Sequence, residues 1–121
     1  MALFDVTQMA LEKALVGSSL RQRVLADNLA NVNTAGFKRS EVDFQSALTD
    51  ALDGGSAARS VEGLDFQPQV EGGGAVRADG NDVDVDAEMA NLSENAVTYQ
   101  ALVAVAKERL QMFQTVLGGA R

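Results

Sequence analysis

The acidic residues near position 80 are the strongest candidates for chemistry in this sequence. Carboxylates alternate with other residues in the run Asp79-Gly80-Asn81-Asp82-Val83-Asp84-Val85-Asp86. An EF-hand loop needs oxygen ligands at positions 1, 3, 5 and 12 and glycine at position 6. If Asp82 is position 1, position 6 is Ala87, and if Asp79 is position 1, position 5 is Val83. Neither register fits, so we expect no metal site and interpret the run as a tight turn that leads into a helix.

Other candidate sites are weaker. The chain has no Cys and no His, which excludes disulfides and catalytic triads built on imidazole or thiol. Gly72-Gly73-Gly74 is not followed by the Lys-Ser/Thr pair of a phosphate-binding loop, and we interpret it as a linker. Ser18 and Ser19 beside Arg21 are better explained as one face of a helix. We therefore expect no enzyme activity and no cofactor.

Length and charge narrow the class of protein further. A chain of 121 residues is expected to form one domain. A formal net charge of -7 argues against nucleic acid as a partner. Acidic residues interrupt the N-terminal apolar residues, so we expect no cleaved secretory signal. No stretch reaches the roughly 20 apolar residues that a membrane span requires.

The last third of the chain carries the clearest structural pattern. Apolar residues recur there at alternating steps of 4 and 3, which is the a/d pattern of a helix that packs against another helix. We call these residues the seam: Val85, Met89, Leu92, Ala96, Tyr99, Val103, Ala106, Leu110, Phe113 and Leu117. They predict a helix over residues 84–117, about 50 Å long, with Asp84 as its N-cap. We expect Tyr99 and Phe113 to belong to the core.

A second helix is predicted over residues 3–32, where Leu11, Leu15, Leu25 and Leu29 share one face and the middle is small and polar. It should end near residues 31–33, where Asn and Gly tolerate the left-handed conformation of a helix stop. Residues 33–52 are predicted as a turn and a short helix capped by Asp43.

The middle of the chain separates the two predicted helices. Residues 53–80 hold seven of the eleven glycines and the only proline, and we expect a flexible, irregular segment with short extended pieces. The predicted fold is mainly α: one domain over residues 1–121, built as an elongated, coiled-coil-like antiparallel hairpin of the two terminal helices. Because the first helix cannot cover the whole seam, part of the seam should meet other chains.

The turn after the first helix resembles a known family signature. The run Leu25-Ala26-Asp27-Asn28-Leu29-Ala30-Asn31-Val32-Asn33-Thr34-Ala35-Gly36-Phe37-Lys38 is similar to the N-terminal signature of the rod and hook family of bacterial flagellar axial proteins. Val42-Asp43-Phe44, the acidic run and the absence of a large inserted domain resemble the short proximal-rod members. The resemblance implies an assembly motif made of Asn28, Asn31, Asn33, Thr34, Gly36, Phe37, Lys38 and Phe44.

This resemblance implies a structural, non-enzymatic subunit of the basal-body rod, the hollow shaft that transmits torque and is required for motility. Its partners would be further copies of itself, other proximal rod subunits, the adaptor to the membrane ring and the flagellar type III export apparatus. It would reach the rod, which spans the periplasm, without a cleaved signal. The alternative is a cytoplasmic helical-hairpin adaptor or export chaperone.

Overall fold

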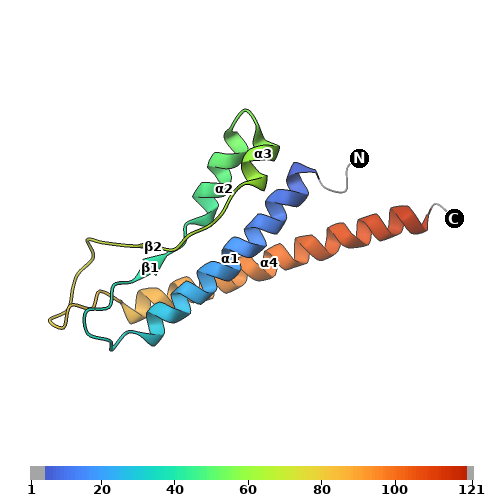
Figure 1. Ribbon diagram of the computed structural model, residues 1–121. Coiled ribbons are helices and arrows are strands. Elements are labelled where there is room, and N and C mark those ends of the chain that lie inside the picture. Colours follow the sequence, from blue (N-terminus) through green and yellow to red (C-terminus); the bar gives the residue numbers. More distant parts are fainter. Residues whose placement is uncertain (1–4, 120–121) are drawn as a thin grey trace.

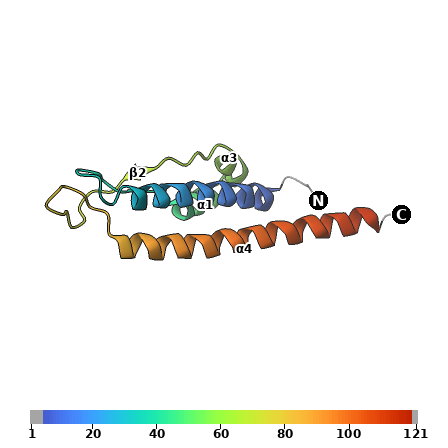
Figure 2. The same ribbon diagram turned by 90° about the horizontal axis from the view of Figure 1, so that it is seen from below.

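Two long helices dominate the protein. The computed structural model describes residues 5–119, in which α1 spans Val6–Ala30 and α4 spans Val85–Gly118. The two helices lie side by side and antiparallel, so that both ends of the chain lie at the same end of the molecule (Figures 1 and 2). The expected helical hairpin and the mainly α fold class are confirmed. α4 has 34 residues against 25 in α1, and its C-terminal turns extend past the start of α1 (Figure 2).

Local sequence explains where these helices begin and end. The Asp5 carboxylate caps α1 by accepting a hydrogen bond from the Gln8 N–H, and Asp84 caps α4 by accepting from the Asp86 and Ala87 N–H groups. The start of α1 expected at residue 3 lies outside the described residues. Asn31 ends α1 without a left-handed conformation (φ −100°), and Gly36 adopts that conformation instead (φ +74°).

The segment between the long helices holds more structure than its composition suggests. It contains β1 (Ser40–Glu41), α2 (Phe44–Asp53), α3 (Ala57–Glu62) and β2 (Gln69–Val70). The two strands pair antiparallel, with Ser40 opposite Val70. The expectation of an irregular segment over residues 53–80 missed α3, which forms because Val61 is fully buried and so holds the helix against the rest of the chain.

A small apolar core joins this segment to α1. It consists of Ala14, Val42, Phe44 and Phe66, and the Phe44 and Phe66 rings meet edge to face at 6.2 Å between centroids. Phe44 lies directly over Gly17, where an added Cβ would stand only 2.5 Å from the Phe44 Cβ. The small residues in the middle of α1 therefore let α2 approach closely. Among the described residues, no helix combines the length and apolar character needed to cross a membrane.

Candidate assembly surface

The signature turn at the end of α1 packs against the acidic loop that precedes α4. Asn81, which is fully buried, donates hydrogen bonds of 2.8 Å from its side-chain amide to the carbonyls of Asn31 and Thr34. Its side-chain oxygen accepts from the Val83 N–H at 2.8 Å. One side chain thus bonds to three backbone groups from both sides of the junction, and this part of the acidic run closes the end of the hairpin.

Two glycines allow this close approach. The Gly36 N–H donates to the Asp79 carbonyl at 2.8 Å, and a Cβ on Gly80 would lie 3.3 Å from the Gly36 Cα. Both residues have positive φ, +74° for Gly36 and +85° for Gly80, a backbone conformation that residues other than glycine rarely adopt. Lys38 closes the junction through a 2.6 Å bond from its Nζ to the Gly80 carbonyl.

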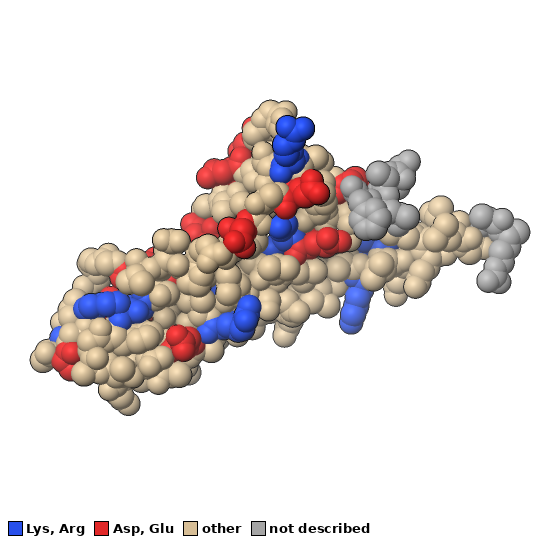
Figure 3. Space-filling model, viewed as in Figure 1, with Lys and Arg blue, Asp and Glu red and all other residues tan. Residues whose placement is uncertain are grey.

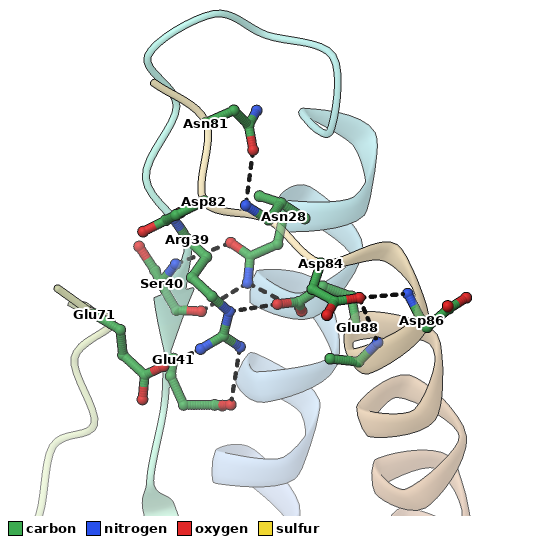
Figure 4. Close-up of polar contacts among 12 residues, drawn as sticks. Asn28, Arg39, Ser40, Glu41, Glu71, Asn81, Asp82, Asp84, Asp86 and Glu88 are labelled. Atoms are coloured by element: carbon green, nitrogen blue, oxygen red, sulfur yellow. Dashed lines mark hydrogen bonds and ion pairs between the residues drawn. The ribbon is translucent and has the colours of Figure 1, made fainter. Parts of the chain in front are cut away.

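A network of charged and amide groups lies next to this junction (Figure 4). The guanidinium of Arg39 pairs with Glu41, Glu71 and Glu88, which come from β1, the residue after β2, and α4. Asn28 of α1 donates to the Ser40 carbonyl at 2.7 Å and to Glu88 at 3.3 Å, and accepts from the Ser40 N–H at 3.0 Å. Glu88 is only 1% exposed. Glu88 lies in the first turn of α4, and its buried carboxylate ties that helix to the signature turn.

The electrostatics of the network favour the charged forms. Burial by itself would raise the pKa of Glu41, but hydrogen bonds from Arg21 and the Val42 N–H outweigh it and hold the pKa below its ordinary value. The hydrogen bond to Glu41 raises the pKa of Arg21. Burial would lower the pKa of Arg39, yet its bond to Glu88 keeps that pKa raised. The ion pair of Arg21 and Glu41 therefore persists at neutral pH.

Most residues of the predicted assembly motif make their contacts within the chain. Asn28, Asn31, Thr34 and Lys38 form side-chain hydrogen bonds, and Phe44 is buried in the core. Asn33 is exposed, and Phe37 is half-buried. The signature closes the end of the hairpin, and its role between chains stays a prediction.

The seam is only partly covered within the chain. Val85, Met89, Tyr99, Leu110 and Leu117 are exposed, Leu110 and Leu117 by 59% and 70%; Leu92, Ala96, Val103, Ala106 and Phe113 are half-buried. The placement of Tyr99 in the core is wrong, since 41% of that residue is exposed. The deepest contacts of α4 are made by Glu88 and Asn95, which the apolar pattern passed over because they are polar.

The part of α4 beyond α1 presents mainly uncharged atoms (Figure 3). Besides the seam residues, Met112 and Val116 are exposed in these C-terminal turns, Val116 by 71%, and Val105 is exposed one turn before Arg109. Soluble monomers rarely expose a contiguous apolar surface of this kind, which is typical of a protein–protein contact. The arrangement offers a binding surface for other helices.

Comparison with known proteins points to one family. A family model described as "Flagella basal body rod protein" matches residues 10–38, which cover most of α1 and the signature turn. The chain is 33% identical to the flagellar basal body rod protein FlgB of Bacillus subtilis (strain 168), over the full length of both chains. It is 31% identical to that of Borrelia hermsii, over 97% of this chain and 99% of the relative. For Salmonella typhimurium the identity is 29%, over 89% and 90%.

Proposed function

The chain belongs to the FlgB family of flagellar basal body rod proteins, and we propose that its α4 seam joins it to neighbouring copies and to other rod subunits. It is a structural subunit of the proximal rod and not an enzyme. Assembly with other rod subunits follows from membership of the family. The proposal concerns which surface makes those contacts.

The observation that carries the proposal is the exposed seam on a helix longer than its partner. Leu110 and Leu117 follow Arg109, whose side chain reaches the start of α1, and both are more than half exposed. Burying one such side chain contributes about 1.5–3 kcal/mol. A row of them on one face supplies enough free energy to hold helices of adjacent subunits together.

The remaining partners are proposed from the family relationship. They are the adaptor that joins the rod to the membrane ring and the flagellar type III export apparatus, which would move the chain out without a cleaved signal. In this proposal the rod spans the periplasm. Asn33, which is exposed, and Phe37, which is half-buried, are proposed as additional contacts between subunits.

A deletion strain tests the function. We expect cells without the gene to lack assembled rods and hooks and to fail to swim, and a plasmid copy to restore both. In fractionated wild-type cells, the chain should copurify with basal bodies. A fully motile deletion strain would contradict the proposal, and a chain found only in the soluble fraction would support an adaptor or export chaperone instead.

A further inference from the structure

The contacts between α1 and α4 repeat at a fixed interval along α4. Four residues of α4 that contact α1 or the core beside it are Glu88, Asn95, Leu102 and Arg109, and each follows the previous one by seven positions. Leu92 and Ala106 of the seam lie between them and are half-buried. Each of the four contact residues precedes a seam residue directly: Met89, Ala96, Val103 and Leu110. If those four seam residues occupy heptad position a, the contact residues occupy position g, which flanks an apolar seam and commonly sets the pairing of helices.

Three of these four positions are polar rungs, by which we mean Glu88, Asn95 and Arg109 with their partners on α1. Glu88 accepts from Asn28, and Asn95 donates at 2.8 Å to both the Ser18 carbonyl and the Gln22 side chain. Arg109 donates to Gln8 at 3.2 Å and to Asp5 at 3.3 Å. Leu102, the apolar exception, packs against the core. The rungs span almost the full length of α1.

The middle rung carries an energetic cost. Asn95 is fully buried, and its Oδ1 has no hydrogen-bond partner within the described part of the chain. An unpaired buried acceptor costs free energy, and an apolar residue of similar shape would remove that cost. Polar residues at the contacts of paired helices lower stability but fix their register.

We propose that the polar rungs set the rotation of α4 about its own axis, turning position g toward α1 and leaving Met89, Leu110 and Leu117 of the seam exposed. Without them, α4 would turn by up to about a fifth of a revolution and bury the exposed seam residues against α1 as well, because burial of the apolar face is favourable and α1 is the helix that lies beside it. That the exposed seam residues then receive a second copy rests on the proposed function. The rungs thus determine which helix the exposed seam residues contact, because they keep those residues available for another chain.

Single cysteines can measure this rotation, because the chain contains none. Val97→Cys would report the outer face, where Val97 is 66% exposed, and Leu102→Cys the face toward α1. In the otherwise unchanged full chain at low concentration, we expect a thiol reagent to modify the Val97→Cys protein at least about tenfold faster than the Leu102→Cys protein. The variant that removes two rungs combines Gln22→Leu, Asn95→Leu and Arg109→Leu.

In that variant the ratio of the two labelling rates should fall to about twofold or less, with the helical content retained. The control variant, Ser93→Leu with Glu108→Leu, adds leucines to the opposite face of α4 and should keep the tenfold ratio. Asn95→Ala, which adds no volume, is the second test if the triple variant unfolds; we expect at least a halving of the ratio. An unchanged ratio in both rung variants, or equal rates in the parent chain, would overturn the proposal.

This measurement needs no flagellum, so it separates the two proposals. A failed labelling test would leave membership of the rod intact. A motile deletion strain would remove the proposed function but leave the rotational role of the rungs untouched.

Discussion

At the scale of single residues, Asn81 decides whether the hairpin end stays closed. Its side chain reaches the carbonyls of Asn31 and Thr34 and the N–H of Val83 through direct hydrogen bonds. A backbone group that is buried without a partner costs about 1–3 kcal/mol. The closure of the junction therefore depends on one amide more than on any of the surrounding carboxylates.

We predict that Asn81→Ala lowers the free energy of unfolding by about 1–3 kcal/mol, because the buried Val83 N–H loses its partner and the Asn31 and Thr34 carbonyls each lose one of their two hydrogen bonds. Urea unfolding followed by circular dichroism measures this. Asn33→Ala is the matched control in the same junction, since Asn33 is exposed, and should change stability by less than about 0.5 kcal/mol. Equal effects of the two substitutions would show that the Asn81 bonds contribute little.

Sequence reasoning identified some of these residues for a different reason. Asn28, Asn31 and Gly36 were singled out through a family signature, and the structure shows that all three make hydrogen bonds inside the chain. The role of Asn81 was not predicted, because an Asn in an acidic run is typical of any turn. Its partners lie 47 and 50 residues away, and no local pattern encodes contacts at that distance.

At the scale of elements, Gly17 determines how closely α2 packs on α1. Glycine inside a helix normally costs about 1 kcal/mol relative to alanine. Here an added Cβ would lie 2.5 Å and 2.7 Å from the Cβ and Cγ of Phe44, which are too close for real contacts. The steric requirement of Phe44 outweighs the helix propensity.

We predict that Gly17→Ala lowers the melting temperature, with a net destabilisation of about 1–2 kcal/mol, because overpacking costs more than the helix propensity returns. Gly118→Ala is the control: it also lies in a helix, and an added Cβ meets nothing within 4 Å. It should be neutral or slightly stabilising. If Gly17→Ala raised the melting temperature, α2 would have to sit farther from α1 than the structure shows.

The two long helices were predictable because their signal is periodic and local. Capping by Asp84 and Asp43 followed from the same reasoning and agrees with the structure. α3 was missed because glycines flank it on both sides and its stability comes from burial of Val61. The rotation of α4 could not be predicted either, because the heptad pattern locates an apolar face but does not show whether the first helix or another chain covers it.

At the scale of the whole molecule, the protein exposes apolar residues that a neighbouring subunit would cover. Three polar rungs join its long helices, and Met89, Leu110 and Leu117 of the apolar seam stay exposed. The stability of the isolated chain therefore depends on the junction, the core around Phe44 and the rungs. Assembly would then bury the surface that folding leaves exposed.

We predict that Leu110→Asp blocks rod assembly and motility while leaving the isolated chain folded. Leu110 is 59% exposed, so a carboxylate there should alter the stability of the isolated chain by less than about 0.5 kcal/mol. In an assembled seam, the same carboxylate would lose its hydration without a partner, at a cost of several kcal/mol.

The measurements are swimming in soft agar, recovery of the chain with basal bodies and urea unfolding of the purified protein. Gln111→Asp adds the same charge at the next, exposed position and should assemble normally. Normal motility of the Leu110→Asp strain would refute the placement of the seam between subunits.

The spacing of the hairpin contacts along the chain also implies an order of folding. Asn81 and Thr34 are 47 residues apart, Asn28 and Glu88 are 60, Ser18 and Asn95 are 77, and Asp5 and Arg109 are 104. Closing the first loop costs most of the loop-closure entropy, and each later contact then brings together only a short further stretch of chain. The hairpin should therefore zip from the junction toward the termini, and the outer turns of α1 and α4 should be the last to close and the first to fray.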